Sequence, residues 1–265
     1  MRELKIGKHR LKIYDSIEEL PIVRHHKFSK LMLIDANVGS DISDFDAHLE
    51  RVFRYIRVNK PDMAEKELMV LRQNVFFIQT EVSPKHLAFA ALIHTLDGQQ
   101  NEDLTDEALK ALVAKLSDVT VGEMNLAIEE SKKKLDSELQ VYFPQLFDSA
   151  PVKDYYDKLK RRTLLIVKKL TEELTPGEEK ELDSLTTDLI IFSEPQSFSG
   201  PDSFEVQQDK QFENACLAIS QNTNADPKKF TVLEYYNALF FIKEQNKAQS
   251  KRIHKKSRTR RYERR

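Results

Sequence analysis

The stretch Phe45-Asp-Ala-His-Leu-Glu-Arg-Val-Phe-Arg-Tyr-Ile56 indicates the fold class of this 265-residue chain. Its apolar residues recur at spacings of three and four, which places them along one side of an amphipathic helix: Phe45, Leu49, Val52, Phe53 and Ile56. Ser43, followed three residues later by Asp46, predicts the start of this helix, because such side chains accept hydrogen bonds from unpaired N–H groups of a first turn. We therefore expect a helix that buries this apolar side.

The rest of the chain carries similar signals. Pro61 opens a second long helix, whose apolar side holds Leu68, Leu71, Val75 and Ile78. A helix that is apolar nearly all round is predicted from Ser83 to Asp97-Gly98, the pair expected to end it. Further helices are predicted over residues 105–116, 121–139, 153–174, 176–192, 204–221 and 231–247. In the helix over 153–174, the expected apolar face is formed by Leu159, Ile166, Leu170 and Leu174.

Polar and apolar residues alternate before and after Gly7-Lys-His, which predicts a β-hairpin. The predicted fold class is therefore mainly α, with helical bundle units, a small N-terminal β-hairpin and an extended basic C-terminal arm. Divided along the sequence, the expected parts are the hairpin with a helix cap, a helical unit, a second helical unit with a loop at 193–203, and the basic arm: residues 1–20, 21–149, 150–246 and 247–265.

Charge is strongly segregated along the chain. Residues 247–265 contain ten Lys or Arg and one acidic residue, so this arm has a net charge of +9. The remaining residues contain 32 basic and 42 acidic side chains, a net charge of −10. A basic segment with few apolar residues favours contact with phosphates or with an acidic protein surface over packing into a core. The residues expected to make that contact are Lys251, Arg252, Lys255, Lys256, Arg258, Arg260, Arg261, Arg264 and Arg265.

Three hypotheses account for the arm. As a nucleic-acid arm, it would bind DNA or RNA without sequence preference and with strong salt dependence. As a protein-docking arm, it would bind an acidic surface, including the acidic body of another copy of the chain. As a third alternative, it is a disordered end that improves solubility.

Residue patterns for catalysis, cofactors or metals are weak. The six glycines form no phosphate-binding loop, and the one cysteine, Cys216, lies in an apolar helical pattern that predicts a buried thiol. The pair His25-His26 is interpreted as part of a solvated charged segment, not as metal ligands. We therefore expect no enzyme, cofactor or metal site. No segment has the length of apolar sequence needed to cross a membrane, and the N-terminus does not resemble a secretory signal, so we expect a cytoplasmic protein.

Consecutive aromatic residues in Tyr235-Tyr-Asn-Ala-Leu-Phe-Phe241 cover more than one side of a helix. Core packing is the preferred interpretation. Because one partner helix cannot cover all of them, part of the set is also a candidate interface: Tyr235, Tyr236, Phe240 and Phe241.

Two regions resemble proteins of tailed bacteriophages. The opening segment from Leu4 to Pro21, with its S-x-x-E-L-P turn, is similar to the start of many small morphogenesis proteins. The segment from Asn214 to Asn246, with Asp226-Pro-Lys-Lys-Phe-Thr-Val-Leu-Glu-Tyr-Tyr, resembles the helical C-terminal part of tail assembly chaperones. Residues 41–56 and the helices after them resemble proteins of phages that infect gut Bacteroidetes.

The resemblance implies a non-enzymatic protein of virion assembly, either chaperone-like or a head or tail component. Its partners would be other phage structural proteins or further copies of itself, in the host cytoplasm during assembly or in the virion. Unlike a typical tail chaperone, the chain is long and carries the basic arm. This difference raises the alternative of a virion component that contacts packaged DNA or the portal region. The alternative is an accessory protein that binds nucleic acid without sequence specificity; an enzyme with a dispersed site is a rarer possibility.

Overall fold

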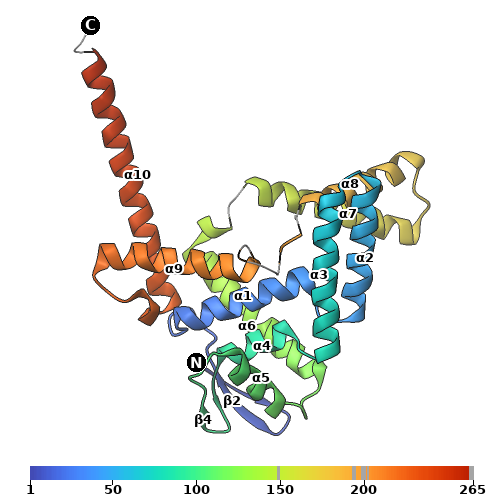
Figure 1. Cartoon of the computed structure of the whole chain (residues 1–265), viewed down its shortest axis with the longest axis horizontal. Coiled ribbons are helices and arrows are strands. Elements are labelled where there is room, and N and C mark those ends of the chain that lie inside the picture. Colours follow the sequence, from blue (N-terminus) through green and yellow to red (C-terminus); the bar gives the residue numbers. More distant parts are fainter. Residues whose placement is uncertain (148–149, 193–194, 198–200, 202, 263–265) are drawn as a thin grey trace. The chain divides into compact units, whose positions relative to one another are not determined.

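The computed structural model describes the backbone of residues 1–147, 150–192, 195–197, 201 and 203–262. Side chains are described for the same residues except 150–153, 191 and 248–262. The protein is mainly helical with a small β-sheet near the N-terminus, which confirms the predicted fold class (Figure 1).

The chain folds into two compact units, and each unit is assembled from segments that are separate in the sequence. The first contains Met1–Ser29, Phe89–Leu135 and Gln207–Arg265, and the second contains Lys30–Ala88 and Asp136–Val206. The parts predicted from the sequence instead follow one another along the chain. The difference arises because four helices supply residues to both units: α1 (Ile22–Val38), α4 (Pro84–Leu92), α6 (Val121–Tyr142) and α9 (Phe204–Thr223).

The first unit contains a four-stranded antiparallel sheet in the order β1-β2-β3-β4. Strands β1 (Arg2–Ile6) and β2 (His9–Ile13) form the predicted hairpin, and Gly7 between them has a φ of +54°. Strand β2 also pairs with β3 (Ile93–Leu96), which turns into the short β4 (Gln99–Gln100). The pair Asp97-Gly98 therefore makes a hairpin turn, and its interpretation as a helix end was wrong.

Buried polar groups explain why α4 gives way to a strand at this point. The guanidinium of Arg24 donates hydrogen bonds to the carbonyls of Ala91 (2.9 Å), Ile93 (3.2 Å) and Asn101. The side-chain amide of Asn101 donates to Ala90 and Ile93. The carbonyls left unpaired at the end of α4 thus gain partners, and a cation lies at the C-terminus of the helix, where its dipole favours positive charge.

The core of the first unit lies on one face of this sheet. Ile6, Leu11 and Ile13 are buried, while Lys5, Arg10 and Lys12 on the alternate positions are exposed. Buried side chains of α4, α6 and α5 (Asp106–Lys115, capped by Thr105) complete it. A β-bridge between Pro21 and Thr231 joins the segment before α1 to the start of α10 (Val232–Tyr262). The helix α10 is longer than predicted, because its helical backbone continues past Lys247 to Tyr262.

The second unit contains α2 (Ile42–Arg57) and α3 (Pro61–Thr80), the two helices predicted from the sequence, which pack against each other. The start of α2 differs from the prediction. Asp41 caps this helix by accepting hydrogen bonds from the N–H groups of Ser43 and Asp44. The carboxylate of Asp44 in turn accepts from the N–H of Asp41, which completes a capping box. The expected Ser43–Asp46 pair is thus displaced by two residues.

The buried sides of these two helices also differ from the prediction. Phe53 and Ile56 of α2 are more than half exposed, and Leu68 of α3 is 48% exposed. The two helices bury His48, Val52 and Tyr55 on α2, and Ala64, Glu67, Val70 and Asn74 on α3. Polar partners for His48, Glu67 and Asn74 turn this side of each helix inward.

The second unit also contains the short 3-10 helix η1 (Pro144–Leu146) and the hairpin of α7 (Ala150–Thr171) and α8 (Pro176–Phe192). Thr175 and Glu178 cap α8 reciprocally. Leu165 is the residue of α7 that lies deepest among those whose side chains are described, whereas Leu170, expected on the buried face, is 82% exposed. Most of the predicted loop at 193–203 lies outside the described residues.

Candidate functional site

The aromatic residues of α10 pack into the first unit. The ring of Tyr235 stacks on Phe212 of α9 at 5.9 Å, and Tyr236 meets His25 of α1 edge-on at 6.3 Å and stacks on Phe240. Burial raises the pKa of both tyrosines. Tyr235 is buried, Tyr236 and Phe240 are partly buried, and Phe241 is 63% exposed, so the packing of the first three serves the fold while a partner interface at these residues stays a prediction.

The histidine pair of α1 takes part in this packing. His25 is buried, and the ring of His26 stacks on Phe212 at 4.2 Å while its Nε2 lies 2.8 Å from Asp209 of α9. The interpretation of a solvated charged segment was therefore wrong, because α9 and α10 cover it. Cys216 of α9 is buried as predicted, and burial raises the pKa of its thiol.

The basic segment follows the packed part of α10. Ile242 is buried, and residues 243–247 are exposed. Seven of the predicted contact residues lie on the helical backbone beyond this point: Lys251, Arg252, Lys255, Lys256, Arg258, Arg260 and Arg261. Arg264 and Arg265 lie outside the described residues. Because an α-helix turns about 100° per residue, these seven positions are spread around its circumference.

A second set of cations lies on the outer face of the sheet in the same unit. Lys5 lies opposite Arg10 in the β1–β2 register, and Lys12 lies between Glu3 and Thr95 of the neighbouring strands. These residues line an open hollow of about 410 Å3. Within the described part of the chain, no carboxylate forms an ion pair with Lys5, Arg10 or Lys12. This face was not among the sites predicted from the sequence, although polar and apolar residues alternate along both strands.

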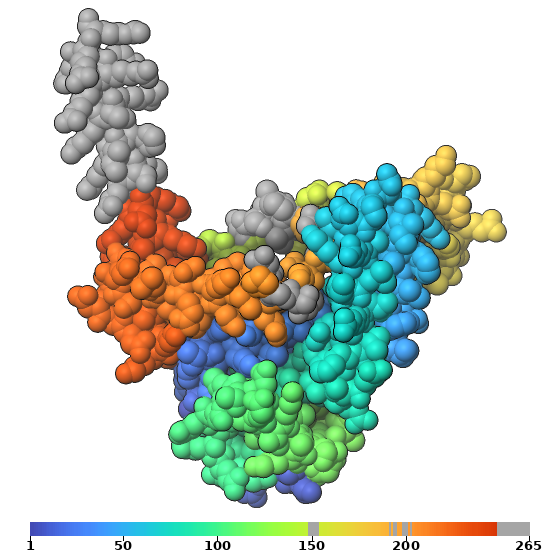
Figure 2. Space-filling model, viewed as in Figure 1, coloured from blue at the N-terminus to red at the C-terminus, as the bar shows by residue number. Residues whose placement is uncertain are grey.

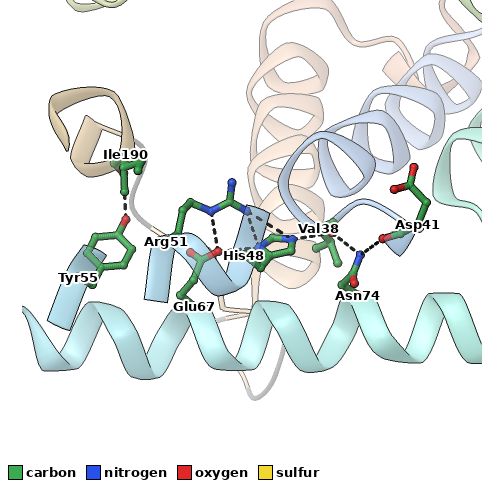
Figure 3. A network of polar contacts seen from close by, with 8 residues as sticks. All are labelled: Val38, Asp41, His48, Arg51, Tyr55, Glu67, Asn74 and Ile190. Carbon is green, nitrogen blue, oxygen red and sulfur yellow. Dashed lines mark hydrogen bonds and ion pairs between the residues drawn. The ribbon is translucent and has the colours of Figure 1, made fainter. Parts of the chain in front are cut away.

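A buried polar network joins α1, α2 and α3 within the second unit (Figure 3). His48 lies with Nδ1 2.6 Å from Oε1 of Glu67 and with Nε2 2.7 Å from the carbonyl oxygen of Val38. That carbonyl, at the end of α1, also accepts from the amide of Asn74 at 3.0 Å. Nε of Arg51 donates to Glu67 at 2.8 Å, so one carboxylate holds both a guanidinium and an imidazole.

Comparison with known families, curated proteins and solved structures finds no match to this chain. Among the residues that the structure describes, no three His, Cys, Asp or Glu are grouped so that they could hold a metal ion. No described helix is both long and apolar enough to span a bilayer.

The charged surfaces and the network differ in what they can do. The network is buried, holds α1, α2 and α3 together, and reaches the surface at Arg51. The cations of the outer strand face, Lys5, Arg10 and Lys12, are exposed to external anions, and the basic positions of α10 belong to the same unit. Figure 2 shows the α9 and α10 region that precedes the basic segment as an exposed part of the surface.

Proposed function

We propose that this chain is a non-enzymatic protein of tailed-phage assembly, chaperone-like or a head or tail component, and that the C-terminal part of α10 binds the phosphates of nucleic acid. The observation that carries the proposal is that α10 changes along its length from a segment packed in the core to a strongly basic segment. α10 is anchored in the first unit through Tyr235 and Ile242, and the segment with a net charge of +9 continues from it. A concentrated positive charge thus follows directly on a folded unit in the sequence.

Two features favour nucleic acid over an acidic protein as the partner. Cationic positions all round the helix suit a phosphate backbone, which can be approached from any side without a fixed register. The outer strand face supplies further cations without ion-pair partners among the described residues, Lys5, Arg10 and Lys12, in the same unit. That strand face also favours the second candidate function, an accessory protein that binds nucleic acid without sequence specificity and without a role in the virion.

The test is binding to duplex DNA across a salt series. Three proteins are compared: the full chain, a chain ending at Asn246, and a full-length chain in which every Lys and Arg from 251 to 265 is Gln. We expect log K for the full chain to fall linearly with log salt concentration, and both variants to lose most of the slope. Undiminished binding by the two variants would contradict the proposed role of α10.

The partner and the assembly role need separate readouts. If the full chain binds no DNA at any salt concentration, but sediments as a larger species that the Gln variant does not form, the arm docks on the acidic body of another copy. Incorporation is tested by mass spectrometry of purified virions from a phage that encodes the chain. Absence from both virions and assembly intermediates, with DNA binding retained, would leave the accessory-protein function.

A further inference from the structure

A hollow of about 300 Å3 lies in the second unit among α2, α7 and α8. Its size is at the lower end of the range for sites that hold small molecules, about 300–1,000 Å3. Apolar residues, including Leu159 and Leu189, line part of it, and Arg51 and Arg162 line another part. An apolar wall combined with two cations is typical of a site for an organic anion.

Arg162 differs from three other cations of α7. Lys158, Arg161 and Lys168 each pair with a carboxylate of α8, at 3.2, 2.7 and 2.6 Å. Arg162 instead donates from Nε to the hydroxyl of Thr186 at 3.0 Å. No carboxylate of the described residues forms an ion pair with it. The neutral hydroxyl fixes the side chain but leaves its charge uncompensated, with the terminal nitrogens available.

Arg51 is held in place from the buried side of α2. Its Nε donates to Glu67, whose side chain is 4% exposed, and a second guanidinium nitrogen contacts His48 (Figure 3). The side chain of Arg51 itself is 31% exposed. A guanidinium fixed in this way loses little conformational freedom when an anion binds, which favours affinity.

Glu50, the acidic residue in the lining, does not form an ion pair with Arg51 or Arg162. Glu50 points its carboxylate toward Arg54, 3.8 Å away, and is 68% exposed. Arg54 also pairs with Asp183 of α8 at 2.6 Å. The positive charge of Arg162 therefore has no counter-charge among the lining residues.

We infer that this hollow binds a small organic anion, a molecule with a carboxylate or phosphate group on an apolar or aromatic body. The anionic group would contact Arg162 and Arg51, because guanidinium groups bind carboxylate and phosphate oxygens in matched geometry. The body would pack against Leu159, Leu189 and the ring of Tyr155, which is itself supported by Phe192 at a ring distance of 4.9 Å.

Phenyl phosphate is the probe for this inference, with inorganic phosphate and benzyl alcohol as partial probes. Binding to the full chain is followed by amide chemical shifts in a titration. We expect saturable shifts at residues of α2, α7 and α8 with a Kd at or below about 1 mM, and weaker binding of both partial probes by roughly tenfold or more. Equal binding of inorganic phosphate would overturn the apolar part of the inference, and equal binding of benzyl alcohol the anionic part.

Matched variants locate the site. Arg162→Gln should weaken phenyl phosphate binding by roughly tenfold or more, whereas Arg161→Gln, one residue away and paired with Glu181, should change it less than about twofold. Ala47→Leu places bulk in the hollow from an exposed position of α2 and should block binding without removing a charge. If Arg162→Gln does not fold, Ala47→Leu alone tests whether the hollow is the binding site. Unchanged affinity in Arg162→Gln and Ala47→Leu, or no saturable binding by the wild type, would overturn the inference.

Discussion

Nδ1 of His48 lies 2.6 Å from Oε1 of Glu67, and both side chains are almost completely removed from solvent. Each residue comes from the middle of a different helix, so the contact fixes how α2 and α3 face one another. Arg51 binds the same carboxylate oxygen, and the carbonyl of Val38 contacts the far side of the imidazole. The centre of this helix pair is therefore polar, with Val52, Tyr55 and Ala64 forming the apolar cluster beside it.

Glu67→Ala tests how much this contact stabilises the protein. The change leaves His48 and Arg51 without their shared acceptor, and removing one partner of a buried polar contact typically costs about 3–5 kcal/mol. We expect a loss of that size in the free energy of unfolding of the second unit, measured by urea denaturation with circular dichroism.

Glu65→Ala is the matched control, because Glu65 lies on the exposed side of the same helix. Its effect should stay within about 0.5 kcal/mol. Similar losses in the two variants would show that helix propensity, not the buried contact, determines the result.

The same contact marks a limit of prediction from sequence. Periodicity identified α2 and α3 as helices, because spacings of three and four depend only on local geometry. It placed Val52 on the buried side correctly but missed the polar residues there, since Glu67 and Asn74 look like solvent-facing residues until the carbonyl of Val38 and the ring of His48 lie beside them. Partners that are distant along the chain decided which residues became buried.

Strand β3 shows a related limit. The apolar run before Asp97-Gly98 fitted a helix, although Asp-Gly is also a strong hairpin signal. The strand forms because β2 supplies hydrogen-bond partners and Arg24 binds the carbonyls where α4 ends. For the candidate sites, the basic segment was visible as a charge pattern, whereas the hollow beside Arg162 required α2 to pack on α7 and α8, more than 100 residues away in sequence.

A pH-dependent contribution to stability is expected from His9. Its Nδ1 lies 2.6 Å from Asp97 and its Nε2 2.9 Å from Asp118, and these hydrogen bonds raise the pKa of His9 above its ordinary 6.5. They also contribute to lowering the pKa of Asp97, after the N–H of Arg10, and that of Asp118.

The direction in which stability changes with pH follows from the direction of each pKa shift. The His9 contribution is fully present below pH 6.5 and is lost as the pH rises through its raised pKa. The aspartate contributions are present above their ordinary value of 3.8 and are lost as the pH falls through their lowered pKa values. Melting temperatures of the wild type should therefore fall from pH 6 to pH 8 more than those of His9→Gln. Parallel profiles would contradict a role for His9.

Two glycines should respond in opposite ways to substitution by alanine. Gly39 has a φ of +67°, and a Cβ there would overlap the carboxylate of Asp44, which helps to cap α2. Gly39→Ala should therefore destabilise the protein by about 1–3 kcal/mol. Gly122, in the first turn of α6, has open space around it, so Gly122→Ala should stabilise by about 0.4–1 kcal/mol. Chemical denaturation measures both, and a stabilising Gly39→Ala would refute this account.

Ending the chain at Asn246 should leave the fold of the first unit intact. Ile242 is the last buried residue of α10 whose side chain is described, and residues 243–247 are exposed. The segment removed therefore contributes charge and not core packing, and the melting temperature should change by no more than a few degrees. Ile242→Ser in the full chain is the contrasting variant, because it buries a hydroxyl in place of an apolar side chain and should lower the melting temperature clearly. If the truncation proves as damaging as Ile242→Ser, the C-terminal part of α10 is a structural element, and the DNA-binding comparison would need the Gln variant alone.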